Sequence, residues 1–513
     1  MKNNAFMRVF LPCLCTVSIL FAGCAKQEEN STTSGDEAET IEVSFSVIVP
    51  DAVNVSDTRA VDAGPYLLTG QKGENEVNTI TLFIVGVNGG VELRSSDVSY
   101  KTISIETAKK YDPVHSCSVS VVGTKTFTQH VYIGANLSDS QIAAFLAGEP
   151  IVSSATSAPG VLDEVMDFDA DGKACNMVMF TQVKNPVDGS YIFRLTGKDN
   201  LNGETNPKEI LLERLVGKVL LTFAMDGSQI NFTDRFGAAY KGWCTLEDID
   251  YILPTVGRRT FIERHSPADN ISSILNEELE TSDGRNIYFG TPFTAASNPV
   301  HPIAYDESRM KSTSASAADA ATHYFEGVYA LETQVVNDID NPTSFGRYVT
   351  MDDIARGAVP YLAVRFRYVP SRFFHGSLTE ETVFSTRAEA EAVLTDGTFY
   401  VNEVVGHKGY YTPAAYEAAL STGQYTKSEF AQLKNGICYY RAFINAPAVD
   451  AAGVQTYAGS TGQTIGLERN NYHIVNVPTV VLPGDAELRD YIRVNSTVID
   501  WANRGSNTVN VIP

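Results

Sequence analysis

An unbroken alternation of apolar and polar side chains runs through residues 41–49. A period of two is typical of a β-strand that buries one of its faces. Pro50 and Asp51 come next, and both residue types are disfavoured in strands, so the strand should end there. The apolar face of this predicted strand carries Ile41, Val43, Phe45, Val47 and Val49.

Further along the chain, the pattern predicts a central strand and a hairpin. Residues 77–87 are apolar on both faces, which is typical of a strand in the middle of a β-sandwich. Asn88, Gly89 and Gly90 supply the residues that a tight turn needs, so we expect a hairpin into residues 91–93. Another strand is predicted over residues 130–135.

A short helix is predicted directly after that strand. Ser138 is a favourable residue for the N-cap of a helix, and Gly148 is a favourable residue just beyond its end. Between them, Ile142, Phe145 and Leu146 recur on one face. This face should pack against the sheet.

A second block of strands begins near residue 206. Residues 210–225 form a long apolar run, and residues 244–262 follow as a strand–turn–strand unit. This order is similar to that of residues 41–93, although no clear repeat is present. We therefore predict an all-β chain with two β-sandwich domains in tandem, over residues 60–205 and 206–513.

Residues 381–435 interrupt the second block with signals for helix starts. These signals are the capping boxes Thr386–Glu389 and Thr426–Glu429 and the cap Thr412-Pro413. We predict a helical insertion here, and strands again over residues 438–443 and 472–477. The tail, residues 490–513, holds two more predicted strands around Trp501, with Ile492, Val494, Val498, Val509 and Val511 as their apolar positions.

The N-terminus has the features of an export signal. Lys2 and Arg8 are basic, and the apolar stretch 9–23 is shorter than the span of about 20 residues that crosses a membrane. Cys24 follows Ala-Gly and precedes a polar segment, which resembles a lipobox whose cysteine is lipidated, with Phe21 in place of the usual leucine. The alternative is an ordinary cleaved signal, over residues 1–24, with a chance cysteine.

The segment after Cys24 is predicted to be a tether followed by a removable strand. Residues 25–40 are polar and acidic and cannot bury a core. A second polar loop follows the strand 41–49 and contains Arg59 and Ala60. An arginine in such a loop is well placed for cleavage by a trypsin-like protease. Residues 25–59 would then form a propeptide.

The net charge of −22 argues against a nucleic-acid partner, which would need a basic surface stripe. Beyond Cys24, the exported chain contains Cys117, Cys175, Cys244 and Cys438. Two disulfides, Cys117–Cys175 and Cys244–Cys438, would each lie within one predicted domain. Free buried thiols are the alternative, and the low cysteine density favours them.

The sequence offers little catalytic chemistry. Asp167, Asp169 and Asp171 with Gly172 resemble the opening of an EF-hand, but Val178 occupies the twelfth position, where that loop requires a bidentate glutamate. A solvated acidic turn is the simpler interpretation, and a looser calcium site is the weaker one. No HExxH, GxSxG or phosphate-loop motif is present. We expect neither an enzyme nor a cofactor.

The order of these segments resembles the type V pilus fimbrillins of Bacteroidales, especially the minor, short-fimbria subunit group. The resemblance spans essentially the whole chain. It rests on the lipobox at Cys24, the strand 41–49, Thr58-Arg59-Ala60, ITLFIVGVNGGVEL at 80–93, ERLVGKVLL at 213–221, ICYYRAFIN at 437–445, LERNNYHIVNVPTVVLPGD at 467–485 and the final strands. It implies transthyretin-like sandwich domains in a surface fimbrium that supports adhesion. It also implies an outer-membrane lipoprotein precursor, which an arginine-specific protease cuts after Arg59.

The residues permit the strand-exchange assembly that this resemblance implies. Loss of strand 41–49 from a sheet edge would cost on the order of 10 kcal/mol before entropy and leave an apolar groove. A strand from the tail of a second copy would fill it, which gives a head-to-tail polymer with itself and with other fimbrial subunits. The alternatives are a fimbrial tip or accessory subunit and a monomeric surface lipoprotein that binds glycans or cells. In the monomer, strand 41–49 is permanent and the tail closes its own domain.

Overall fold

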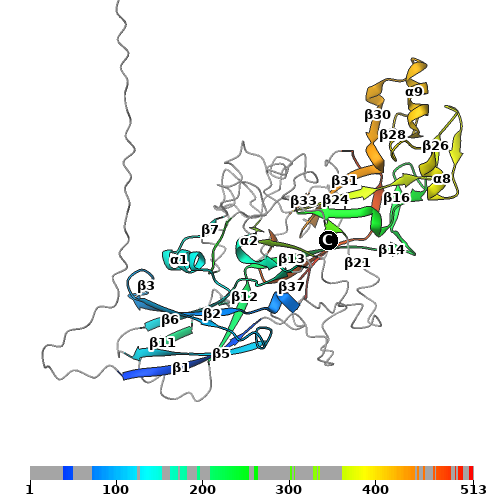
Figure 1. The fold of residues 1–513 in the computed structure, drawn as a ribbon. Helices are drawn as coiled ribbons and strands as arrows, with labels where there is room; N and C mark the ends of the chain where they lie inside the picture. The colour runs from blue at the N-terminus through cyan, green and yellow to red at the C-terminus, as the bar shows by residue number, and fades with distance from the viewer. Residues whose placement is uncertain are drawn as a thin grey trace, which may run out of the picture. The chain divides into compact units, whose positions relative to one another are not determined.

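The chain folds as an all-β protein with short helical insertions, as the sequence predicts (Figure 1). The computed structural model describes residues 39–49, 72–123, 128–152, 162–170, 174–181, 193–196, 208–253, 259–263, 301–302, 305–306, 327–331, 333–334, 361–444, 448–449, 455–456, 466–467, 469–486, 492, 495–500 and 508–511. No helix in these ranges is long and apolar enough to cross a membrane.

The first half of the chain builds a nine-stranded sheet in the order β3-β2-β6-β10-β12-β1-β5, with β4 on β2 and β11 on β6. Its strands are β1 (Glu39–Ile48), β2 (Thr79–Asn88), β3 (Val91–Glu92), β4 (Val98–Ser104), β5 (Val114–Gly123), β6 (Thr128–Ala135), β10 (Met179–Thr181), β11 (Phe193–Thr196) and β12 (Lys208–Arg214). The predicted strand 41–49 and the predicted hairpin at Gly89-Gly90 are both confirmed.

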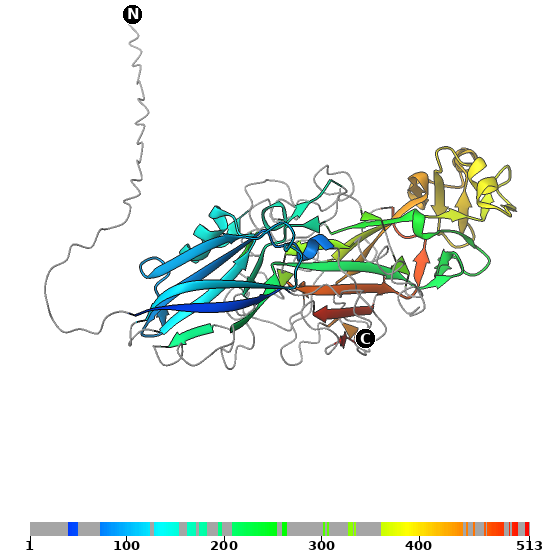
Figure 2. The same ribbon diagram turned by 60° about the horizontal axis from the view of Figure 1, so that its bottom comes forward.

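This sheet folds over on itself to form a β-sandwich (Figure 2). Side chains of β2 at Ile80, Leu82 and Ile84 pack in one core with Phe45 and Val47 of β1, although three strands separate β2 from β1 in the sheet order. The opposite face of β2 packs into a second core, as expected for a strand that is apolar on both faces.

The predicted short helix covers that opposite face. Helix α1 (Asp139–Ala147) begins at Ser138, whose hydroxyl accepts the backbone N–H of Gln141, and ends at Gly148 in the left-handed conformation. Ile142 and Phe145 are buried in the second core. The helix and its inner face are therefore confirmed.

The predicted long strand over residues 210–225 is two strands. The chain leaves the first sheet after β12 and enters another sheet one residue later, at β13 (Val216–Phe223). That second sheet runs β21-β13-β35-β37-β38, with β22 on β13. Its other strands are β21 (Tyr305–Asp306), β22 (Val328–Leu331), β35 (Asn471–Val477), β37 (Asn495–Asp500) and β38 (Thr508–Val511).

A four-stranded sheet faces this one and completes a second sandwich. Its order is β20-β18-β24-β31, formed by β18 (Ile249–Ile252), β20 (His301–Pro302), β24 (Tyr361–Arg367) and β31 (Ile437–Phe443). Leu221 and Val475 from one sheet pack in the same core as Tyr251, Val364 and Tyr440 from the other. Residues 40–513 form one compact unit, and the domain division near residue 205 stays a prediction.

The insertion contains more strand than its helix signals indicate. Helices α8 (Arg387–Ala392) and α9 (Pro413–Ser421) begin at the expected caps, Thr386 and Thr412. The Thr426–Glu429 box starts only a short 3-10 helix, η4 (Lys427–Glu429). A five-stranded sheet in the order β27-β26-β29-β28-β30 accompanies them: β26 (Arg372–Phe374), β27 (Glu381–Val383), β28 (Phe399–Asn402), β29 (Gly409–Tyr411) and β30 (Phe430–Leu433).

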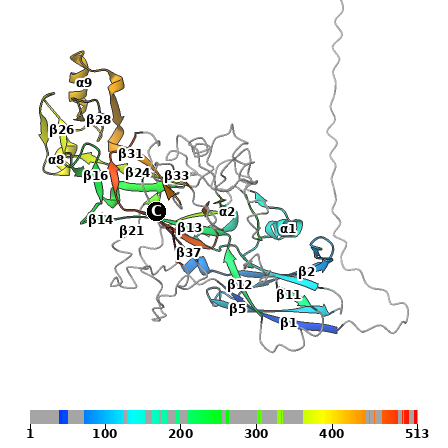
Figure 3. The ribbon, with the colours of Figure 1, turned by 180° about the vertical axis from the view of Figure 1, so that it is seen from behind.

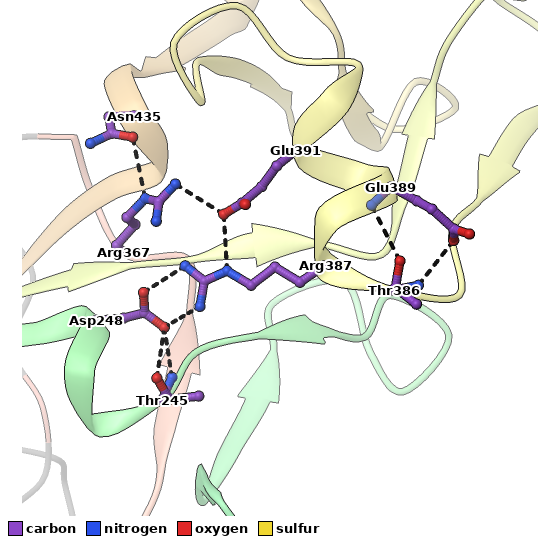
Figure 4. A network of polar contacts seen from close by, with 8 residues as sticks. All are labelled: Thr245, Asp248, Arg367, Thr386, Arg387, Glu389, Glu391 and Asn435. Atoms are coloured by element: carbon purple, nitrogen blue, oxygen red, sulfur yellow. Dashed lines mark hydrogen bonds and ion pairs between the residues drawn. The ribbon is translucent and has the colours of Figure 1, made fainter.

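A polar network joins the start of α8 to the second sandwich (Figure 4). The guanidinium of Arg387 donates to both carboxylate oxygens of Asp248, at 2.5 and 2.6 Å. Its Nε donates to Glu391 at 2.9 Å, and Arg367 donates to the same carboxylate at 2.9 Å. These two carboxylates raise the pKa of Arg387 against the opposing effect of burial.

The remaining elements are short. Two-stranded pairs join β7 (Ile151–Val152) to β19 (Arg259–Thr260), β8 (Asp167–Phe168) to β9 (Ala174–Cys175), β14 (Met225–Asp226) to β15 (Gln229–Ile230), β16 (Phe232–Asp234) to β36 (Val480–Leu482), β17 (Gly242–Trp243) to β25 (Val369–Pro370), β23 (Thr333–Gln334) to β34 (Gly466–Leu467), and β32 (Ala448–Val449) to β33 (Gln455–Thr456). Single turns of helix are η1 (Lys72–Asn75), α2 (Leu162–Val165), η2 (Leu246–Asp248) and η5 (Lys434–Gly436).

Candidate functional site

The predicted removable strand, β1, lies inside the first sheet and not at an edge. It pairs in parallel with β12, where Phe45 faces Lys208 and Ile48 faces Leu211 in the register. On its other side it neighbours β5, and the backbone N–H of Val49 donates to the carbonyl of Pro113 at 2.9 Å. Figures 1 and 3 show β1 and β5 side by side. The edge position considered from the sequence is therefore wrong, because alternation reveals a buried face but not the neighbours of a strand.

The inward face of β1 is buried as its alternation predicts. Phe45, Val47 and Val49 have exposed fractions of 0, 0 and 1%. They pack in one core with Ile210 and Leu212 of β12. Ile41 and Val43 lie within β1, but their side chains are outside the described residues. The position of β1 is thus a slot between two strands, and its floor is apolar.

The β5 wall of this slot carries two buried titratable side chains. Cys117 belongs to the same core as Phe45, and burial raises the pKa of its thiol to about 11. His115 is also buried, and loss of hydration lowers its pKa despite the nearby Asp112. Both groups therefore favour their neutral forms here. Cys117 is a free thiol, as are Cys175, Cys244 and Cys438, so neither disulfide considered from the sequence is present.

The tail of the chain extends the second sheet. Strand β37 pairs antiparallel with β35, so that Val498 faces His473. Strand β38 pairs antiparallel with β37, where Val509 faces Val498 and Val511 faces Ser496. Among the described strands, β38 is the last in the order and has β37 as its one neighbour. The side chains of these two strands are outside the description.

Ile492 is placed differently from the rest of the tail. Its side chain is 5% exposed and belongs to the core of the second sandwich, and its backbone N–H donates to the carbonyl of Arg441 at 2.9 Å. The core of the second sandwich thus includes Ile492, and among the described strands β38 pairs with β37. Val494 lies outside the described residues.

A buried ionic cluster fixes the chain just after the proposed cleavage loop. Glu74 of η1 and Lys218 of β13 are both fully buried, with 2.8 Å between Oε1 and Nζ. Tyr329 also donates its hydroxyl to Glu74, and Arg214 Nε donates to the Glu74 carbonyl at 3.0 Å. Sequence reasoning missed this cluster, although Arg214 and Lys218 are, with Glu213, the charged residues of the largely apolar run 210–225.

The other residues singled out from the sequence have simple placements. Asp167 accepts a hydrogen bond from the side chain of Asn176 at 2.7 Å, and Asp169 is exposed. The described part of the chain contains no group of three or more His, Cys, Asp or Glu side chains that could hold a metal ion. Cys24, Arg59, Ala60 and Asp171 lie outside the described residues, so lipidation and cleavage remain predictions.

Comparison with known proteins finds likeness in structure alone. No protein-family model and no curated protein matches the sequence. A fimbrillin, FimA, from Porphyromonas gingivalis W83 is 12% identical, with a TM-score of 0.38, over 90% of this chain and 97% of that chain. The tip fimbrial protein Mfa3 from Porphyromonas gingivalis, truncated at its C-terminus, is 11% identical, with a TM-score of 0.37, over 90% of this chain and 100% of that one. A candidate cell adhesion protein from Parabacteroides distasonis ATCC 8503 is 12% identical, with a TM-score of 0.38, over 90% of this chain and 100% of that one. The chain is thus similar to solved structures of fimbrial and cell-adhesion proteins.

Proposed function

We propose that this chain is a structural subunit of a surface fimbrium. On this proposal it is exported as a lipoprotein through Cys24, is cut after Arg59, and polymerises by strand exchange. The observation that carries the proposal is the position of β1, which lies between β12 and β5 with its apolar face in the core. Because β1 precedes Arg59 in the sequence, one cut there separates it from the retained chain.

Removal of β1 would leave a slot that needs an occupant. Three inward side chains of β1 are fully buried, and each contributes roughly 1.5–3 kcal/mol, or about 5–9 kcal/mol together before entropy. Both neighbouring strands would also lose hydrogen-bond partners for backbone N–H and carbonyl groups. An incoming strand with alternating apolar residues restores both kinds of contact.

The tail of a second copy is the occupant that we propose. In β38, Val509 and Val511 alternate with Thr508 and Asn510, which is the same period of two as in β1. Strand β38 has one described neighbour, so its release breaks a single ladder. A donor at the C-terminus and a slot near the N-terminus make a head-to-tail contact, which propagates into a filament.

One observation favours the alternative of a monomeric surface module for adhesion. Strand β37 pairs with β35 of its own chain and β38 pairs with β37, and Ile492 packs into the core of its own sandwich. In that case β1 stays in place, and the tail completes its own domain. The two functions differ in whether β1 leaves its sheet and in which chain the tail pairs with.

Purified precursor treated with an arginine-specific protease separates these functions. The proposal expects an N-terminus at Ala60 and filaments in negative-stain micrographs, whereas Arg59→Gln should give neither. The double variant Val509→Asp with Val511→Asp should be cut normally but form no filaments, because each charge would enter an apolar slot at a cost of several kcal/mol. Cleavage at Ala60 without filaments would favour the monomer. Filaments from the double variant would exclude β38 as the donor.

A further inference from the structure

The two strands beside β1, β5 and β12, differ in how many neighbours they have in the sheet. Strand β12 lies between β10 and β1, so it keeps a neighbour when β1 is absent. Strand β5 comes last in the order, and among the strands that the structure describes its one neighbour is β1. We infer that β5 is a conditional strand, which belongs to the sheet only while a strand occupies the position of β1.

Only some of the described side chains of β5 are buried against the sandwich. His115 and Cys117 point into the core, with exposed fractions of 5 and 6%. Val114 is 46% exposed, and Ser116 is exposed as well. The contacts of Cys117 are made in the core that Phe45 and Val47 help to form, so departure of β1 weakens the side-chain contacts of β5 together with its ladder.

Loss of β1 therefore favours local opening of β5. Its backbone groups can bond to water once they leave the sheet, which removes the cost of leaving them unpaired in the slot. Segments with few buried apolar contacts and solvent-exposed ladders open at the lowest free energies in a folded protein. The opening should stop at the core formed by β2 and β6, which pair with each other over eight positions.

The partner that closes β5 again is a strand with the pattern of β1. It must place apolar side chains where Phe45, Val47 and Val49 lie, and it must offer backbone groups on both edges, one to β12 and one to β5. If the proposed function holds, this strand comes from a second copy, and β5 becomes ordered again only in the assembled chain. The dependence of β5 on β1 does not itself rest on that function.

A matched pair of substitutions in the full chain tests the inference without cleavage or filaments. Val47→Asp places a charge in the core and should expel β1, whereas Ile48→Asp changes the half-buried outward position next to it. Reactivity of Cys117 with a maleimide is followed by peptide-resolved mass spectrometry, together with hydrogen exchange of residues 114–118. We expect both to rise at least tenfold in Val47→Asp and to change less than twofold in Ile48→Asp. Cys244 and Cys438, buried in the second sandwich, should stay unreactive in both variants.

The outcomes separate clearly. Protection of Cys117 and of residues 114–118 in Val47→Asp, with exchange of β1 increased, would overturn the inference. If Val47→Asp unfolds the whole chain, Cys244 and Cys438 will react too. Ser46→Pro then replaces it, because it removes one backbone donor of β1 and leaves every inward side chain intact. The same two readouts decide. Absence of filaments after cleavage would count against the proposed function and would leave this result unchanged.

Discussion

Asp234 should make the stability of the second sandwich fall as the pH rises. Its side chain is 5% exposed, at the end of β16. Burial raises its pKa to about 6, although Tyr368 and Tyr410 donate to its Oδ2 at 2.5 and 2.7 Å and the backbone N–H of Phe236 donates to Oδ1 at 2.8 Å. Loss of hydration thus outweighs three hydrogen bonds that favour the carboxylate.

The sign and size follow from linkage. An acid whose pKa is higher in the folded state binds its proton more tightly there, so its contribution to stability is complete below its unfolded value of 3.8 and is lost as the pH rises through about 6. A difference of about two pKa units corresponds to about 3 kcal/mol, since each unit is about 1.4 kcal/mol. The free energy of unfolding should fall by about this amount between pH 4 and pH 7 relative to a chain without the group.

Asp234→Asn is that reference. We would measure urea unfolding of the wild type and of Asp234→Asn at half-unit steps from pH 4 to pH 7, with Asp226→Asn, an exposed position, as the control for net charge. The difference between the wild type and Asp234→Asn should change by about 3 kcal/mol across this range, whereas Asp226→Asn should run parallel to the wild type. Parallel curves for the wild type and Asp234→Asn would refute the reasoning.

Two further predictions concern ionic contacts. Arg387→Ala should lower the free energy of unfolding by about 2 kcal/mol, because it removes a bidentate contact to Asp248. The stability of Arg387→Lys should lie between those of the wild type and Arg387→Ala. An unchanged midpoint in chemical unfolding would contradict this. Lys218→Met should lower the free energy of unfolding by about 3–5 kcal/mol, because it removes the positive charge that lies beside the buried Glu74 carboxylate. Adding Glu74→Gln should recover part of that loss, and a double variant as costly as the two single losses combined would show that the two side chains are not coupled.

Local features of the fold were predictable because each has its cause in adjacent residues. The burial of Phe45, Val47 and Val49 follows from their spacing, and the start of α1 follows from the hydroxyl of Ser138. The presence of two sandwiches was predictable from the order of strands. The observed strands confirm the predicted all-β fold class.

Features that depend on distant residues were not predictable. The neighbours of β1 come from residues 114–123 and 208–214, and no local pattern in the sequence specifies this order. The break between β12 and β13 at Leu215 is hidden because Leu215 is itself apolar and no turn residue marks the end of β12. Lys218 lies within the apolar run 210–225, and its burial depends on Glu74, which is far away in sequence. The strands of the insertion are three or four residues long, which is too short for an alternation of apolar and polar residues to reveal them.

The parallel pairing of β1 with β12 has a consequence for biosynthesis. The two strands are about 160 residues apart, so their pairing closes a long loop and forms slowly compared with neighbouring hairpins. Synthesis produces β1 before either of its neighbours, and although β5 is made earlier, the position between two strands is complete only when β12 exists. We therefore expect the first strand to be translated to be among the last to dock. If β1 docks late, most of the sandwich has folded before β1 binds. The later removal of β1 therefore leaves the rest of the sandwich folded.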